Sequence, residues 1–316
     1  MASSLSLYYF MKSEHLFANL RKDRIKLSVP EKCNDPLEFK PCDGNHADSD
    51  ASAKEDLGFI SFSSDFSNSA MWGHYADSHK GVCLQFDIPV SFVNEPDWHG
   101  KRKRSEQFFL IKNPTEEQQY LHSPKKADKY YPLISKIKYD LYRPKGTQKV
   151  VVDSSNGDDV CVRVTRPYTQ KSSDWQYEQE YRLFAALSRC EYDEGNYFLH
   201  GLNQYLKCII LGTKCSLTEK TMKQELVRMG ECGNQLKRKK DFIRRAAYSP
   251  VFYSLVKEGE ENKNVPTPSV SIILNQENAQ YLERLLSHDN VPHSLQDFVA
   301  LIRKTVKEQK ETEKQA

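Results

Sequence analysis

Two glutamates in the stretch "WQYEQEYRL" are the first candidates for chemistry in this sequence. Glu178 and Glu180 stand among aromatic residues, and Arg182 follows two positions later. If the stretch is a strand, side-chain alternation places all three on one face and the apolar residues on the other. Three charged groups are not buried together without partners, so that face is either a solvated edge or the wall of a polar cleft.

A second candidate site is the basic run "LKRKKDFIRR" near residue 240. Charge runs of this kind are usually solvated faces, but an intense cluster beside aromatic residues also suits a polyanion such as nucleic acid or cofactor phosphates. Both interpretations stay open. The predicted nucleic-acid contacts are Lys237, Arg238, Lys239, Lys240, Arg244 and Arg245.

The composition limits the class of protein. The 316 residues are 38% hydrophobic and 28% charged, and the net charge of +3 does not by itself mark a nucleic-acid binder. No apolar run approaches the roughly 20 residues that span a bilayer, and the beginning lacks a basic leader, so we expect a cytoplasmic protein without membrane contact. The eight cysteines form no C-x-x-C pair, which favours reduced thiols and predicts no metal site.

Short alternating apolar runs between helical patterns predict an α+β fold with mixed or antiparallel sheets and flanking helices. The start "LYYFMK" is expected to be a strand. Further strands are predicted at 24–28, 57–63, 81–88, 135–141, 148–152, 160–165, 180–187 and 206–212, helices at 13–22, 67–78, 114–130 and 216–229, and surface loops at 43–56, 95–107 and 153–159.

A charged, proline-bearing break predicts two parts. The sequence "KEGEENKNVPTPS" at 257–269 has the composition of a linker. We therefore expect the α+β domain to cover 1–256. Amphipathic patterns beyond the linker predict a C-terminal helical accessory at 270–316.

Four segments carry a resemblance to a known family. In order they are "NDPLEF", "MWGHYADSHKGVCLQFD", "WQYEQEYRL" and "IILG". They resemble the recurring motifs of the bacterial family catalogued as domain of unknown function 2971, over roughly residues 5 to 215. The family name supplies no activity, but the resemblance implies that these segments form one domain and converge on one site.

A fainter resemblance suggests chemistry. The order strand, helix, short strand at residues 6–28 is similar to the opening of ADP-ribosyltransferases that modify DNA or remove RNA phosphates, although "LYYFMK" has no histidine. In those enzymes the first strand and a serine or threonine after the helix hold nicotinamide adenine dinucleotide (NAD), and a late strand carries a glutamate. The resemblance implies NAD contacts at Tyr8, Tyr9 and Ser28, to which convergence of the segments adds Asn34, Asp35, His74 and Arg182.

The two glutamates suit this reaction. Cleavage between nicotinamide and ribose builds positive charge on the sugar, which a nearby carboxylate stabilises. We expect Glu180 to do this, and Glu178 to orient or deprotonate the incoming nucleophile. Replacing Glu180 by glutamine is then expected to lower turnover by about a hundredfold or more and to leave the melting temperature nearly unchanged.

The leading hypothesis is thus an NAD-dependent ADP-ribosyltransferase, or an NAD glycohydrolase, acting on a nucleic-acid or protein acceptor. Such an activity suits a toxin or an antiviral defence effector. The alternatives are a non-catalytic nucleotide- or nucleic-acid-binding protein and a nuclease effector. The sequence contains no G-x-G-x-x-G motif, Walker loop or nucleophile elbow, which removes support from dehydrogenase, kinase and hydrolase classes.

Overall fold

The computed structural model confirms an α+β protein with mostly antiparallel sheets. It describes residues 3–40, 42, 57–96, 102–111, 133–144, 149–150, 153–154, 164–237, 239, 241–249 and 254–258. The chain divides into two compact units, Met1–Ala246 and Ala247–Ala316. The strand β17 (Leu255–Lys257) belongs to the second unit. The predicted helix at 114–130 and the predicted helices of 270–316 lie outside the described residues, as does the predicted linker beyond residue 258.

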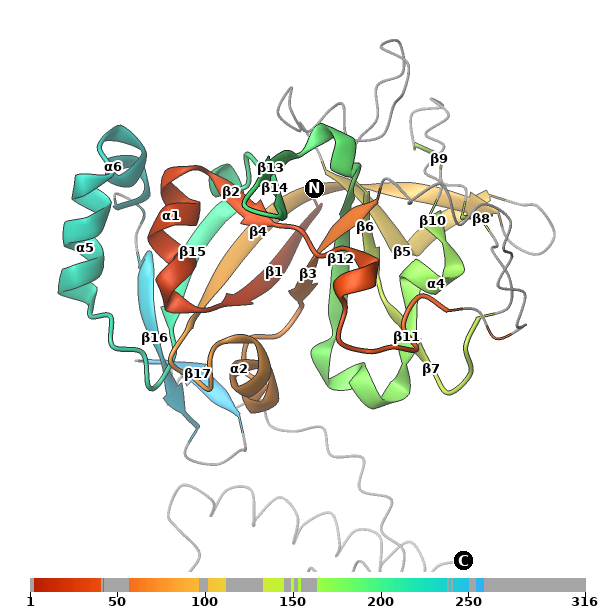
Figure 1. The fold of residues 1–316 in the computed structure, drawn as a ribbon, viewed down its shortest axis with the longest axis horizontal. Helices are drawn as coiled ribbons and strands as arrows, with labels where there is room; N and C mark the ends of the chain where they lie inside the picture. Colours follow the sequence, from red (N-terminus) through yellow and green to blue (C-terminus); the bar gives the residue numbers. More distant parts are fainter. Residues whose placement is uncertain are drawn as a thin grey trace, which may run out of the picture. The chain divides into compact units, whose positions relative to one another are not determined.

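Six strands of the first unit pair in a closed ring, because β1 pairs with both β3 and β4 (Figure 1). In order around the ring they are β1 (Ser3–Met11), β3 (Gly58–Ser63), β12 (Glu180–Ala185), β6 (Leu133–Lys136), β5 (Arg102–Ile111) and β4 (Val82–Pro96). All these pairings are antiparallel. Outside the ring, β4 also pairs with β9 (Asp153–Ser154) and β15 (Leu206–Leu211), and β15 pairs in parallel with β16 (Ile243–Tyr248).

The described residues also form three small sheets. One has the order β13 (Glu191–Asp193), β14 (Asn196–His200), β2 (Arg24–Lys26). The second pairs β7 (Lys138–Asp140) with β11 (Gln170–Ser172) in parallel, and the third pairs β8 (Lys149–Val150) with β10 (Val164–Thr165). The strand β11 contains Lys171.

The helices within the described ranges are short. The α-helices are α1 (Leu16–Arg21), α2 (Ser69–Tyr75), α4 (Arg166–Thr169), α5 (Glu219–Arg228) and α6 (Glu231–Lys237), and the 3₁₀ turns are η1 (Ser13–His15), η2 (Pro30–Lys32), η3 (Ser173–Glu178), η4 (Leu187–Arg189) and η5 (Asn203–Tyr205). The Asn68 side chain caps α2 by accepting a hydrogen bond from the Ala70 amide at 2.9 Å. Trp72 of α2 is fully buried against Phe10 of β1, so the helix is fixed to the sheet.

The strand β12 separates two apolar clusters by its alternation. Leu183 faces the main core, which also contains buried residues of α1, β4, β15 and α5. Phe184 faces a smaller cluster with Phe59 and Tyr168. Arg182 shares that second face, so a charged side chain enters an aromatic layer and must find partners there.

Three sequence predictions about local structure are wrong. The predicted surface loops at 95–107 and 153–159 both overlap strands, because residues 95–96 belong to β4 and residues 153–154 form β9. Residues 102–107 were expected in a surface loop but belong to β5, where the Arg104 guanidinium lies 3.1 Å from the centre of the Phe92 ring on β4. The predicted strand at 135–141 is two strands, β6 and β7. It breaks at Ile137, whose amide donates to the Glu180 carbonyl at 2.9 Å.

Candidate active site

Five charged side chains meet inside the protein, and we call them the acid cluster: Glu38, Lys171, Glu178, Glu180 and Arg182. Their side chains are between 1% and 7% exposed, which rules out the interpretation of a solvated strand edge. They come from the segment after η2, from β11, from η3 and from β12. A charged cluster buried this deeply depends on internal pairing for its stability.

Glu178 is not on the strand, contrary to the sequence prediction. It ends the 3₁₀ turn η3, and Gln179 then adopts a left-handed conformation with φ 46° and ψ 48° before β12 begins at Glu180. The chain reversal at Gln179 still directs the Glu178 side chain into the acid cluster. Lys171 contacts both Glu178 and Glu180 there. The predicted convergence of the two acids therefore holds, although it arises from a turn and not from strand alternation.

Glu180 is bound on both oxygens. Arg182 donates from Nε to Oε1 at 2.8 Å and from Nη2 to Oε2 at 2.9 Å, and the Ser61 hydroxyl donates to Oε1 at 2.6 Å. Burial alone raises the pKa of Glu180, but Arg182 and Lys171 outweigh it and lower the pKa to about 2. Glu180 is thus a permanent anion whose charge is neutralised within the protein.

Glu178 has fewer partners. Tyr75 of α2 donates to Oε1 at 2.5 Å, and Lys171 donates to Oε2 at 2.6 Å. Burial raises the pKa of Glu178 above that of an ordinary glutamate, with Lys171 only partly offsetting it. Each oxygen keeps acceptor capacity, since an ionised carboxylate offers about four lone-pair positions.

Lys171 and Glu38 complete the cluster. Lys171 Nζ lies 3.9 Å from Glu38, which also pairs with Arg182. Burial lowers the pKa of Lys171, but the three glutamates outweigh it and raise the pKa overall. The Arg182 guanidinium also lies 4.7 Å from the centre of the Phe59 ring and donates to the Tyr168 carbonyl at 3.0 Å.

The sequence reasoning missed four members of this site: Lys171, Glu38, Ser61 and Tyr75. The need for counterions was the available signal, since a buried pair of glutamates with one arginine requires a second cation. Glu38 stands in "NDPLEF" and Tyr75 in "MWGHYADSHKGVCLQFD", two segments that share a resemblance with the glutamate stretch. Nothing in single-sequence periodicity identifies Lys171 or Ser61.

A cavity of about 410 Å³ opens on the acid cluster. Its charged lining includes all five members of the cluster and also Lys26 and Lys32. The remaining lining residues are Tyr9, Phe10, Ser28, Cys33, Asn34, Phe59, Ser61, Phe62, Ser63, Met71 and Tyr75. Carboxylates and lysines in one concave site can hold a ligand that carries both hydroxyl groups and phosphates.

The residues predicted to contact NAD divide into two groups. Tyr9, Ser28, Asn34 and Arg182 line the same cavity as the two glutamates, and burial raises the pKa of Tyr9 to about 12. The other three do not line it. Tyr8 lies beside Phe66, Asp35 accepts from the Trp175 indole at 3.1 Å, and His74 is exposed on α2.

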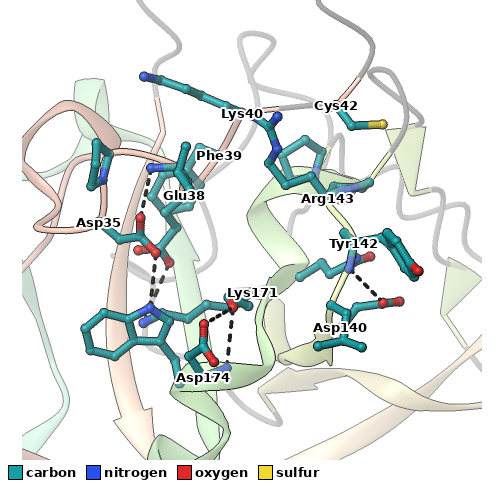
Figure 2. Close-up of a pocket in the computed structure, with 18 of the residues that line it drawn as sticks. Asp35, Glu38, Phe39, Lys40, Cys42, Asp140, Tyr142, Arg143, Lys171 and Asp174 are labelled. Carbon is teal, nitrogen blue, oxygen red and sulfur yellow. Dashed lines mark hydrogen bonds and ion pairs between the residues drawn. The ribbon is translucent and has the colours of Figure 1, made fainter.

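A second cavity of about 1010 Å³ adjoins the first, since Asn34, Glu38 and Lys171 line both. Figure 2 shows the segment from Asp35 to Lys40 on one side of it and Arg143 with Tyr142 on the other. Trp175 and Tyr177 of η3 also line this space. The carboxyl end of η3 thus contributes to both cavities, through Tyr177 to the second and Glu178 to the first.

Three of the basic residues predicted to contact nucleic acid form hydrogen bonds or ion pairs within the protein. Lys239 donates to the Leu206 carbonyl, Arg244 pairs with Asp241 at 2.8 Å, and Arg245 donates to the carbonyls of Gly212, Cys215 and Leu217. Lys237 ends α6. Arg238 and Lys240 lie outside the described residues.

Other site types find no support within the part of the chain that the structure describes. No group of three metal-binding side chains forms there, and six of its cysteines are free thiols. Among the same residues, no helix has the length and apolar character needed to cross a bilayer.

The comparison with protein families confirms the first resemblance. Residues 71–183 match the family described as "Protein of unknown function (DUF2971)". The matched segment runs from Met71 in α2 to Leu183 in β12 and contains Tyr75, Lys171 and both candidate glutamates. No curated protein and no solved structure matches the chain.

Proposed function

We propose that the 410 Å³ cavity binds NAD and that the protein is an ADP-ribosyltransferase-like enzyme of the cytoplasm. One observation carries the proposal. Residues that the ADP-ribosyltransferase resemblance assigns to a single ligand, from Tyr9 through Ser28 to Glu178 and Glu180, line one cavity although the chain separates them widely. A role as a toxin or antiviral effector would follow from the activity.

The bonding within the acid cluster assigns different roles to the two glutamates. Glu180 is saturated by Arg182 and Ser61, so it has little capacity to stabilise a new cation. Glu178 is less compensated, and its raised pKa reflects a carboxylate that gains more from positive charge nearby. We therefore assign Glu178 to the ribosyl centre, and Glu180 becomes a positioning residue that helps to hold Lys171 and Arg182.

The reaction balances with these groups. The bond between ribose C1′ and the nicotinamide nitrogen breaks, and its electron pair leaves with neutral nicotinamide. Glu178 stabilises the oxocarbenium character at C1′ and accepts the proton of the nucleophile, which is water or a group on the acceptor. The products are nicotinamide, the ADP-ribosyl adduct or free ADP-ribose, and one proton that Glu178 returns to solvent.

The cavity also offers groups for the rest of the dinucleotide. Lys26 and Lys32 are exposed at the cavity lining and suit the pyrophosphate, with Ser28 between them in sequence. Lys32 is held in place by donating to the Gly195 carbonyl at 3.0 Å. Lysine acts as a point charge toward phosphate, so this contact would be sensitive to salt.

A rival function is supported by the same neutralisation of Glu180. A cavity whose central acid is fully paired could bind a nucleotide without any chemistry, and the acid cluster would then serve only to shape the wall. The two functions share a ligand class but differ in whether a bond breaks.

Nicotinamide release distinguishes them. The full chain is incubated with NAD, with and without nucleic acid or cell lysate, and free nicotinamide is quantified by chromatography. The proposal expects release that Glu178→Gln abolishes and that Glu191→Gln, a change at an acid paired with Arg24 outside the cavity, leaves intact. NAD binding by calorimetry with no release under any condition would establish the rival.

A further inference from the structure

We infer that Tyr75 is a positioning residue whose hydroxyl fixes the orientation of the Glu178 carboxylate in the wall of the 410 Å³ cavity. Its effect on turnover rests on the proposed function, which assigns Glu178 to the ribosyl centre. The hydrogen bond between the two side chains is a property of the fold itself, so it can also be tested without any reaction.

The contact joins two segments that are far apart in the sequence. Tyr75 is the last residue of α2, and Glu178, 103 positions later, is the last residue of η3. The Tyr75 hydroxyl donates to Glu178 Oε1 at 2.5 Å, and both residues line the cavity. A tyrosine hydroxyl has one proton to donate, and here Glu178 receives it.

The helix α2 gives this hydroxyl a rigid support. Trp72, about one turn before Tyr75, is fully buried, and its indole donates to the Phe66 carbonyl at 2.6 Å. The Asn68 side chain caps the first turn of the helix. These anchors of α2 do not involve Glu178, so Tyr75 brings a fixed donor to the acid.

The same helix also supports the backbone that carries Glu178. The Asn68 side-chain amide donates to the Tyr177 carbonyl at 3.2 Å, and the centres of the His74 and Tyr177 rings are 6.4 Å apart. The helix therefore contacts both the residue before Glu178 and the carboxylate itself. Support at these two neighbouring points restricts the rotation of the acid away from the cavity.

Lys171 alone would not fix this orientation. Its ammonium group lies 2.6 Å from Glu178, 3.5 Å from Glu180 and 3.9 Å from Glu38, so one cation is shared by three carboxylates. An ammonium group is a point charge on a flexible stem and accepts a carboxylate from many directions. The Tyr75 hydroxyl binds one oxygen of one acid and thereby selects its orientation, on which the efficiency of a base or charge stabiliser depends.

The ionisation of Glu178 depends on the same hydrogen bond. Burial raises the pKa of Glu178, whereas Lys171 and the hydrogen bond from Tyr75 lower it. Burial and the neighbouring Glu178 raise the pKa of Tyr75, so its hydroxyl stays protonated and continues to donate. Loss of the hydroxyl should therefore raise the pKa of Glu178. Besides Tyr75, the titratable groups around Glu178 in the described residues are Glu38, Tyr139, Lys171, Tyr177, Glu180 and Arg182.

Tyr75→Phe keeps the ring and removes the hydroxyl, and nicotinamide release by the full chain is measured against pH per folded molecule. The variant is expected to lower kcat by about tenfold or more with little change in KM, and to move the acid limb of the rate to higher pH. The matched control is Tyr181→Phe, at a residue of β12 that packs against the main core and lines neither the 410 Å³ nor the 1010 Å³ cavity. The control should leave kcat and the pH profile unchanged.

A second measurement needs no reaction. The carboxyl carbon of Glu178 is followed by NMR against pH in protein labelled with ¹³C-glutamate without NAD, and its signal is identified by its loss in Glu178→Gln. Tyr75→Phe should move this titration to higher pH, and Tyr181→Phe should not.

An unchanged titration of Glu178 in Tyr75→Phe overturns the positioning role, whatever the effect on turnover. A wild-type chain that releases nicotinamide no faster than Tyr75→Phe overturns it as well. If the titration shifts but the wild type releases no nicotinamide, the proposed function is contradicted and the hold of Tyr75 on Glu178 stands.

Discussion

Glutamine substitutions at the two glutamates should affect different properties. Glu180→Gln should mainly lower the stability of the fold, whereas Glu178→Gln should mainly lower turnover. Glu180→Gln leaves the buried Arg182 with Glu38 as its one carboxylate partner among the described residues and turns an amide group toward donors. The lowering of the Glu180 pKa from 4.5 to about 2 corresponds to about 3 kcal/mol of folding free energy at neutral pH. Removal of one partner from a buried ion pair costs a similar amount, about 3–5 kcal/mol.

Glu178→Gln should cost less than about 1 kcal/mol, because a buried carboxylate with a raised pKa is itself unfavourable. Lys171 would keep Glu180 at 3.5 Å and Glu38 at 3.9 Å as partners. The burial of Glu180 thus changes the expectation from the sequence, in which its replacement leaves the melting temperature nearly unchanged.

Urea unfolding of the full chain, followed by tryptophan fluorescence, measures both changes against the wild type. The expected result is a large fall in the unfolding midpoint for Glu180→Gln and a small change for Glu178→Gln, at an unchanged slope. Equal shifts for the two variants would refute the reasoning, since they would mean that the pairing of Glu180 with Arg182 contributes nothing specific.

Three further predictions concern pH, a glycine and the basic run. The pKa of Glu180 is lowered on folding, so its contribution to stability is complete above pH 4.5 and is lost as the pH falls toward about 2; in acid titrations followed by circular dichroism, Glu180→Gln should flatten this loss. Gly81→Ala should abolish soluble expression, because a Cβ there would collide with backbone carbonyls of Met11 and Ala76, whereas Gly73→Ala, with open space around it, should express normally. Arg245→Met should lower the melting temperature, because the side chain loses three hydrogen bonds to backbone carbonyls. If the variant is less stable but binds nucleic acid as the wild type does, Arg245 is a structural residue.

The sequence predicted the strands well where apolar alternation was strong. The stretches that become β3, β12 and β15 were all identified, because each buries one or both faces. The strand β5 was missed entirely, and the basic residues at its start were interpreted as part of a loop because of their composition. In the structure the Arg104 guanidinium lies over the Phe92 ring, so a charged residue on β5 faces an aromatic ring on β4.

The candidate site was only half predictable. Glu178, Glu180 and Arg182 were recognised from their spacing and from resemblance, but spacing placed Glu178 on a strand that begins two residues later. The left-handed turn at Gln179 has no sequence signal such as glycine. Lys171 and Glu38 enter through tertiary contacts, which a reading of local pattern does not supply.

The rate of nicotinamide release from NAD, measured for the wild type and for Glu178→Gln at equal concentrations of folded protein, tests the central claim most directly. The account predicts release by the wild type and a rate lower by about a hundredfold or more in the variant, with little change in KM. Because the Glu178 pKa is raised, the wild-type rate should also fall in acid at a pH above 4.5, the ordinary value for glutamate. The absence of release from the wild type with any acceptor, or equal rates in the two proteins, would contradict the account.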